Sequence, residues 1–397
     1  MINDKMQALG AKRSVIREIF EYGKKRKSEI GVDNVFDFSL GNPSVSPPKE
    51  VTDELLRLIE TENGAALHGY TSALGDFDVR AAIANHINKT ESVNVSADCI
   101  YMTVGAAAAL TSSIGALTCQ GEEVIVFAPY FPEYKVFIEK AGGVIREVLC
   151  NPDTLLPDIS ELDAAINEKT AAVIINSPNN PTGVVYDESA VSAICDLLKK
   201  KEDEFGKVIY LISDEPYREL VYDGVNVPYL IKYYNDTVIT YSFSKSLSLP
   251  GERIGYVLIS PNMTEKEAVF NAVAGSARAL GYVCAPSLLQ KIIPAVLGKT
   301  SDISIYDRNR KMLWSALSEY GYTVIKPEGA FYLFLRSPIP DAKEFCEAAK
   351  EFELLLVPSD DFGYPGYVRI AYCVNTDVIE RSLPAFYNLA KKYGKAK

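Results

Sequence analysis

Residues 242–255 read Ser242-Phe243-Ser244-Lys245-Ser246-Leu247-Ser248-Leu249-Pro250-Gly251-Glu252-Arg253-Ile254-Gly255, and they follow an apolar run. A lysine at the carboxyl end of an apolar strand loses its proton more easily than an exposed lysine, and its free amine can form a Schiff base with a carbonyl group. The hydroxyl groups of Ser242 and Ser244 and the guanidinium of Arg253 suit a phosphate beside that carbonyl. If this segment stood alone, a loop with a surface lysine would be the simpler interpretation. The flanking sequence is therefore needed to distinguish a surface lysine from a Schiff-base lysine.

Apolar runs of strand length occur on both sides of this segment and alternate with amphipathic stretches of helix length. The runs are residues 100–104, 124–127, 144–148, 171–176, 208–214, 238–243 and 255–259. Nearly continuous apolar strands that alternate with helices predict a mostly parallel sheet covered on both faces. We therefore expect an α/β fold with a large domain over residues 46–289.

The pattern changes after Pro294. A long polar helix is predicted at residues 303–320, and short strands follow near residues 322–325, 331–335, 354–357 and 367–371. The helix predicted at residues 14–27 has no sheet of its own to cover, so we expect it to pack with this C-terminal part. Residues 1–45 and 290–397 would together form a smaller α+β domain.

Composition excludes several classes of function. The 397 residues carry a formal net charge of −11, which repels phosphate backbones and anionic lipid, so neither nucleic acid nor a membrane is an expected partner. Seven scattered cysteines without a Cys-x-x-Cys pair fit reduced thiols in the cytoplasm. Two histidines, His68 and His86, follow no metal-binding spacing, so no metal site is predicted.

Five more short motifs accompany the lysine segment. They are Ser-Leu-Gly-Asn-Pro at 39–43, Tyr-Thr-Ser-Ala-Leu-Gly at 70–75, Thr-Val-Gly-Ala at 103–106, Asn-Asn-Pro-Thr-Gly at 179–183 and Asp-Glu-Pro-Tyr at 214–217. In this order, and over nearly the whole chain, the six segments resemble the fold-type I pyridoxal-phosphate enzymes, in particular the class I/II aminotransferases of the aspartate aminotransferase type. The resemblance implies a large domain with a seven-stranded sheet and pyridoxal 5′-phosphate as cofactor.

The resemblance also implies roles at the cofactor ring. Lys245 would form the Schiff base and then carry the proton from the substrate Cα. Asp214 would pair with the pyridine nitrogen and keep it protonated, which makes the ring an electron sink. Tyr217 and Asn180 would hydrogen-bond the 3′ oxygen of the cofactor, and Tyr130 would stack on its ring. The structural alternatives are a helix cap for Asp214, a turn for Asn180 and core packing for the two tyrosines.

The phosphate would be bound by two segments and by a second subunit. Backbone N–H groups at the start of an alanine-rich helix can bind it together with the helix dipole. These N–H groups belong to Gly105, Ala106 and Ala107. Ser242, Ser244 and Arg253 would add side-chain donors. Tyr70 matches a tyrosine that in this family reaches the phosphate of the neighbouring subunit, which implies a homodimer with shared active sites.

The substrate carboxylate would be bound by Arg369, because a planar guanidinium can form two parallel bonds with it. Asn180 and Gly41 would contact the same carboxylate. Since Arg369 and Gly41 are expected in the small domain and Lys245 in the large one, substrate binding should draw the domains together.

These features predict an aminotransferase that moves the amino group of an L-α-amino acid to a 2-oxo acid. The same residues could serve a C–S β-lyase or another elimination enzyme of this fold, and a non-catalytic cofactor-binding regulator is a further alternative. The motifs do not specify which amino acid is the substrate. Phe331 and Tyr332 are expected to line the side-chain pocket, and Arg278 could pair with the distal carboxylate of aspartate or glutamate or be a structural arginine.

Overall fold

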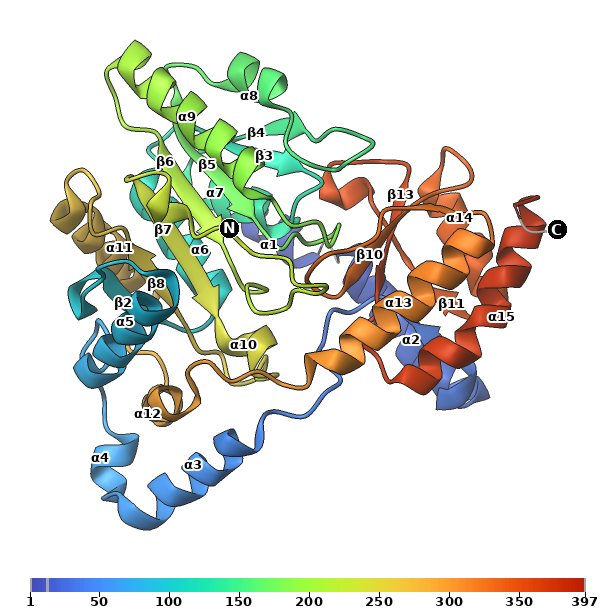
Figure 1. The fold of residues 1–397 in the computed structure, drawn as a ribbon, viewed down its shortest axis with the longest axis horizontal. Coiled ribbons are helices and arrows are strands. Elements are labelled where there is room, and N and C mark those ends of the chain that lie inside the picture. The colour runs from blue at the N-terminus through green and yellow to red at the C-terminus, as the bar shows by residue number, and fades with distance from the viewer. Residues whose placement is uncertain (1, 12–13, 396–397) are drawn as a thin grey trace.

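A seven-stranded sheet forms the centre of the larger part of the molecule (Figure 1) within residues 2–11 and 14–395, which this computed structural model describes. Its strand order is β2-β8-β7-β6-β5-β3-β4. The strands are β2 (Ile100–Thr103), β3 (Glu123–Ala128), β4 (Val144–Leu149), β5 (Thr170–Asn176), β6 (Tyr210–Asp214), β7 (Thr237–Ser242) and β8 (Gly255–Ile259). Each of the seven apolar runs forms one strand, which confirms that prediction.

The sheet is parallel except at β8, which runs antiparallel to both of its neighbours, β2 and β7. It follows that β2 points the same way as β7 and the other parallel strands. The carboxyl ends of β2, β3, β5, β6 and β7 therefore lie along one edge of the sheet. In open α/β sheets this is the edge at which ligands bind.

Helices cover both faces of the sheet. Along β3, Val124 and Val126 belong to the core formed with α6, α7 and α11, whereas Ile125 and Phe127 belong to the core formed with α8 and α9. Successive side chains of a strand point to opposite faces, so these two helix groups lie on opposite sides. The helices around this sheet are α3 (Lys49–Thr61), α4 (Gly64–His68), α5 (Phe77–Glu91), α6 (Ala106–Leu117), α7 (Glu133–Ala141), α8 (Ile159–Ala165), α9 (Glu188–Phe205), α10 (Phe243–Ser246), α11 (Lys266–Leu280) and α12 (Ser287–Val296).

The C-terminal part forms a second core beside the first (Figure 1). It contains an antiparallel sheet in the order β12-β13-β10-β9 and a parallel pair, β1 and β11. The strands are β1 (Phe36–Asp37), β9 (Thr323–Val324), β10 (Tyr332–Arg336), β11 (Leu354–Leu355), β12 (Val357–Pro358) and β13 (Tyr367–Ala371), and the helices are α13 (Ile303–Glu319), α14 (Ala342–Ala349) and α15 (Thr376–Lys392). Short 3₁₀ helices lie at Val32–Asn34, Ala97–Cys99, Leu230–Lys232, Lys350–Phe352 and Asp360–Phe362.

The N-terminal helix α2 (Val15–Ile30) lies against this second core (Figure 1). Ile19 is buried with Leu355 and other residues of the C-terminal strands. A Cβ atom at Gly23 would approach the Leu355 side chain to 2.8 Å, so the helix needs glycine there. Arg26 binds Glu353 at 2.6 Å. The expected packing of this helix with the C-terminal part is confirmed, while the boundaries at residues 45/46 and 289/290 stay predictions.

The helix α1 (Asp4–Ala11) precedes α2 and buries none of its side chains in the described chain. No helix within residues 2–11 and 14–395 has both the length and the apolar character that crossing a bilayer requires.

Candidate active site

A cavity of about 490 Å³ opens where the carboxyl ends of the parallel strands face the C-terminal core. Side chains and backbone from distant segments line it together. Eleven of the predicted site residues do so: Gly41, Ala106, Ala107, Asn180, Asp214, Tyr217, Ser242, Ser244, Lys245, Arg253 and Arg369. Five of the six short motifs thus meet in one cavity, although they lie far apart along the chain, whereas no residue of the motif at 70–75 lines it.

Lys245 lies on α10, a single turn of helix that begins directly after β7. Ser242 caps this turn by accepting a hydrogen bond from the backbone N–H of Ser244. The Lys245 Nζ donates to the carbonyl oxygen of Gly41 at 2.8 Å and lies 5.4 Å from the centre of the Phe331 ring. Burial lowers the pKa of Lys245 to about 8, and the positive charge of Arg253 acts in the same direction. At pH 7 about a tenth of this amine is therefore a free nucleophile, far more than for an exposed lysine.

Asp214 is the last residue of β6 and is buried. Its carboxylate accepts a 2.5 Å hydrogen bond from the hydroxyl of Tyr134 and one of 3.4 Å from the side-chain amide of Asn176. Burial raises the pKa of Asp214 to about 7. No Lys or Arg among the described residues forms an ion pair with it. A buried carboxyl group without a cation suits a ligand that brings a positively charged nitrogen.

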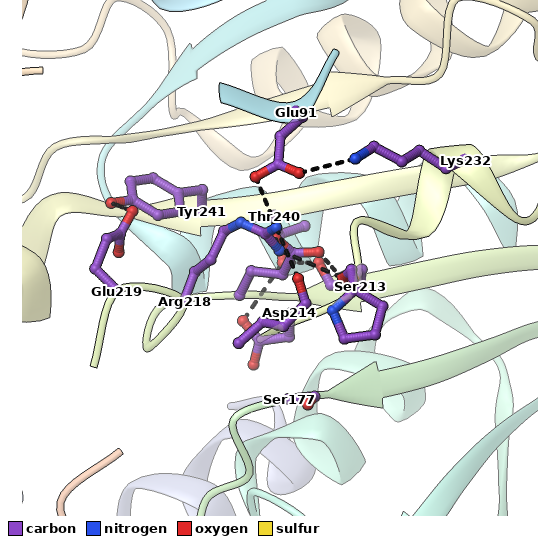
Figure 2. Close-up of polar contacts among 12 residues, drawn as sticks. Glu91, Ser177, Ser213, Asp214, Arg218, Glu219, Lys232, Thr240 and Tyr241 are labelled. Carbon is purple, nitrogen blue, oxygen red and sulfur yellow. Dashed lines mark hydrogen bonds and ion pairs between the residues drawn. The ribbon is translucent and has the colours of Figure 1, made fainter. Parts of the chain in front are cut away.

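A cluster of charged residues stabilises the turn after β6 (Figure 2), and Glu215 is its buried member. Arg218 donates to Glu215 at 3.1 Å and to Glu91 at 2.9 Å, and Glu91 also binds Lys232 at 3.2 Å. Burial raises the pKa of Glu215, and the Arg218 guanidinium opposes this effect. Arg218 therefore connects the turn that follows Asp214 to α5 and stabilises the Glu215 carboxylate, which would otherwise be buried without a cation.

A cradle of donors lies at the start of α6. Gly105 has a φ of +85°, and a Cβ atom there would lie 2.8 Å from an Nη atom of Arg253. The hydroxyl groups of Ser242 and Ser244 lie 2.6 Å apart on the same side of the cavity. The first backbone N–H groups of a helix have no partner within it, and the helix dipole favours an anion at this end. This combination of donors fits a phosphate dianion.

Arg369 on β13 is 2% exposed and faces the same cavity. One Nη atom donates to the Asn180 side-chain oxygen at 3.2 Å, and the other donates to the Ser39 carbonyl at 2.6 Å. Its Nε, also buried, has no hydrogen-bond partner in the described chain. The guanidinium lies 4.7 Å from the centre of the Tyr332 ring. A buried cation with a free donor fits an incoming carboxylate.

The structure does not place Tyr130 where the stacking role requires it. Its hydroxyl donates to Glu147 at 2.7 Å, its ring lies beside Gly363, and it is absent from the cavity lining. The next residue, Phe131, lines the cavity instead. Neighbouring residues in extended chain point to opposite sides, so an offset of one position after β3 decides which ring faces the site.

Of the other predicted residues, Tyr332 lines the cavity, whereas Phe331, Tyr70 and Arg278 do not. Phe331 is buried close to Lys245. Tyr70 is 98% exposed, in the segment between α4 and α5. Arg278 lies on the last turn of α11 and is exposed. The proposed roles of Tyr70 and Arg278 in a neighbouring subunit stay predictions.

Several lining residues have no role in the sequence prediction. They are Ser14, Ile16, Arg17, Phe20, Leu40, Leu110, Phe131, Glu133, Asn176 and Pro216 together with Pro250. Asn176 is the last residue of β5 and Phe131 lies three residues after β3, so the signal that pointed to Asn180 and Tyr130 could have found them. The contribution of α2 has no local signal in the sequence, because it depends on how the two cores pack.

Comparison with known proteins identifies the family. The model described as "Aminotransferase class I and II" matches residues 33–386. The chain is 30% identical to an aspartate aminotransferase of Thermotoga maritima over 373 residues, which are 93% of this chain and 95% of that relative. The chain belongs to the class I and II aminotransferases.

Solved structures and other relatives agree with this aminotransferase assignment. An amino transferase from Eubacterium rectale superimposes with a TM-score of 0.97 at 51% identity, over 99% of both chains. An aromatic-amino-acid aminotransferase 2 of Thermococcus litoralis is 27% identical over 394 residues, 96% of each chain. The predicted fold type, the aminotransferase activity and the cofactor pyridoxal 5′-phosphate are thereby confirmed, and the lyase and regulator alternatives are not favoured.

The cavity of this aminotransferase fits its cofactor. A donor cradle suits the phosphate, a buried carboxyl group without a cation suits the ring nitrogen, and a lysine with a lowered pKa suits the aldehyde. When bound, the cofactor supplies an electron sink for the electron pair at the substrate Cα.

Proposed function

We propose that this enzyme transfers the amino group of an L-α-amino acid to a 2-oxo acid with Lys245 as the Schiff-base residue, in a cytoplasmic homodimer. The observation that carries the proposal is the presence of Lys245, Asp214 and Arg369 in the lining of one cavity. Together they provide an amine for the cofactor, a carboxylate for its ring nitrogen and a guanidinium for the substrate carboxylate.

The residues that would hold the cofactor divide by its chemical groups. Asp214 would pair with the ring nitrogen, and Tyr217 and Asn180 would donate to the 3′ oxygen. Phe131, rather than Tyr130, would pack against the ring. The phosphate would be bound by the start of α6 and by the side-chain donors, which are Gly105, Ala106, Ala107, Ser242, Ser244 and Arg253.

Lys245 would also act as the proton carrier. Burial keeps the pKa of Lys245 near 8, so the amine can accept the proton from the substrate Cα and release it again at neutral pH. Arg369 and Asn180 would hold the α-carboxylate and thereby orient the Cα–H bond toward the lysine. Gly41 supports this arrangement, because a Cβ atom there would overlap the Tyr332 hydroxyl.

The exposed apolar side chains around Tyr70 support a second subunit. Tyr70 is 98% exposed, Phe77 60% and Val283 43%. Cys284, beside Val283, contacts the carbonyl of Thr71, so these segments belong to one surface. Contiguous exposed apolar groups commonly mark an interface. In the proposed dimer, Tyr70 would reach the phosphate of the partner subunit and Arg278 would face its side-chain pocket. The seven free cysteines agree with a reducing compartment such as the cytoplasm.

Reconstitution tests the assignment of Lys245. The purified enzyme should turn yellow with pyridoxal 5′-phosphate, and borohydride reduction should leave the label on the peptide that contains Lys245. Lys245→Ala should take up no reducible label. Labelling of another lysine would contradict the proposal.

A panel of amino donors tests the reaction. With 2-oxoglutarate as acceptor, formation of a new 2-oxo acid together with glutamate is expected. Release of pyruvate and a thiol from a thioether substrate, without amino transfer to 2-oxoglutarate, would indicate a C–S lyase instead.

A further inference from the structure

The helix α2 forms one wall of the active-site cavity. Its face with Ile19 and Gly23 packs on the C-terminal strands. The neighbouring face presents Ile16, Arg17 and Phe20 to the cavity, and residues 16 and 20 lie one turn apart on the same side. The residues of this wall are therefore fixed in place by the packing of the same helix.

The positive charges of the cavity can be counted and assigned. Four lining residues are cationic: Arg17, Lys245, Arg253 and Arg369. Under the proposed function, Lys245 binds the cofactor, Arg253 its phosphate and Arg369 the α-carboxylate. Arg17 is left over. It is exposed, and its guanidinium has no hydrogen bond or ion pair within residues 2–11 and 14–395.

Several apolar side chains line the cavity together with Arg17. Ile16, Phe20, Leu40 and Phe131 line the same cavity. Such groups can accept the methylene carbons of a substrate side chain, but they cannot neutralise a charge at its end. Among the residues that line the cavity, Arg17 is therefore the cation that remains to bind a second carboxylate of the substrate.

We infer that Arg17 is the specificity-determining residue that recognises amino acids and 2-oxo acids whose side chain ends in a carboxylate. This inference rests on the proposed function and names its substrate class. A guanidinium can bind such a carboxylate with two parallel hydrogen bonds, which a neutral side chain cannot replace.

Glu133 provides a probe of opposite sign. It lies in the first turn of α7, lines the same cavity, and has no ion pair in the described chain. A carboxylate in this position repels an anionic substrate side chain. Removing the charge of Glu133 should therefore favour substrates whose side chain ends in a carboxylate, whereas removing the charge of Arg17 should disfavour them.

Arg278 is the competing candidate. It is exposed on α11 and absent from the cavity lining, so it could act only on the site of another subunit. A test with both arginines separates the two assignments.

The experiment uses the holoenzyme and compares kcat/KM for L-aspartate and L-glutamate with kcat/KM for L-leucine and L-phenylalanine, against one 2-oxo acid. The variants are Arg17→Met, which keeps the aliphatic stem, Arg17→Lys, Glu133→Gln and Arg278→Met. Arg308→Met is the matched control, because Arg308 is exposed and lies outside the cavity lining. A second readout is the Kd of succinate, a dicarboxylate that cannot be transaminated, measured by calorimetry.

Arg17→Met should lower the ratio of kcat/KM for dicarboxylic substrates to kcat/KM for neutral substrates about tenfold, mainly through KM. It should weaken succinate binding by a similar factor. Arg17→Lys should restore part of the ratio, and Glu133→Gln should raise it a few-fold. An unchanged ratio and unchanged succinate affinity in Arg17→Met would overturn the inference, as would loss of the ratio in Arg278→Met alone. If no donor is transaminated, the proposed function fails, while succinate binding still decides the role of Arg17.

Discussion

Replacing Asp214 by asparagine should stabilise the cofactor-free enzyme at alkaline pH. The carboxyl group is buried, its hydrogen bonds come from neutral partners, and burial raises its pKa to about 7 from an ordinary value of 3.8. Between these two values the folded protein keeps a proton that the unfolded chain has released. Stability therefore falls as the pH rises through this window, and the full loss is present above pH 7.

The size of the effect follows from the width of the window. One pKa unit corresponds to about 1.36 kcal/mol, so a difference of about three units gives a penalty of about 4 kcal/mol above pH 7. About 2 to 3 kcal/mol of this loss falls between pH 5 and pH 8. Asparagine stays neutral and carries no such penalty.

Urea unfolding of the cofactor-free wild type and of Asp214→Asn at pH 5 and pH 8 measures the effect. The difference at pH 5 contains the cost of the changed hydrogen bonds to Tyr134 and Asn176. The change of this difference in unfolding free energy from pH 5 to pH 8 measures the effect of the Asp214 charge, because the other titrating groups are common to both proteins. We expect the variant to gain about 2 to 3 kcal/mol relative to the wild type over this interval.

A constant difference between the two pH values would refute the reasoning, because it would mean that the carboxyl group ionises in the folded protein without penalty. Saturating pyridoxal 5′-phosphate provides a second check. The ring nitrogen gives the carboxylate a cationic partner, so the cofactor should reduce the pH dependence of the wild type and bind more weakly to Asp214→Asn.

Three further results are expected. Gly105→Ala should weaken cofactor binding at least tenfold in a spectroscopic titration, because the residue has a positive φ and its Cβ would contact Arg253; Gly251→Ala, with open space around it, is the control and should bind normally. In the cofactor-free enzyme, the rate at which an amine-selective reagent modifies Lys245 should rise with a midpoint near pH 8, and a midpoint above pH 10 would contradict its burial in a cationic site. Arg218→Met should lower the free energy of unfolding by about 3 kcal/mol, since it leaves the buried Glu215 carboxylate without its cation, whereas Glu91 keeps Lys232; a loss below 1 kcal/mol in urea unfolding would show that the cluster does not stabilise the turn after β6.

The strands were predictable from the sequence for a physical reason. A strand buried on both faces carries mostly apolar residues, so the central strands appear as apolar runs, and β5 and β7 are buried at every residue. The edge strand β4 is mostly exposed and carries Arg146 and Glu147. The antiparallel direction of β8 leaves no such trace. Its residues are as apolar as those of its neighbours, and only the path of the chain sets its direction.

Tyr130 and Phe131 mark the limit of prediction within the site. Both are aromatic and both follow β3, so composition cannot distinguish them. The structure turns one ring toward Glu147 and the other toward the cavity. A sequence motif locates a strand end to within a residue or two, whereas a ring contact depends on the direction of a single Cα–Cβ bond.

The sequence by itself determined which residue types stand at or near the ends of the strands, and parallel strands bring their carboxyl ends to one edge. Together with the resemblance of the short motifs, this predicted Lys245, Asp214 and Asn180 as site residues. Only the tertiary structure decided what closes the cavity from the other side. The wall formed by α2 exists because Ile19 and Gly23 fit against the C-terminal strands, and a contact between segments more than 300 residues apart leaves no local pattern in either of them.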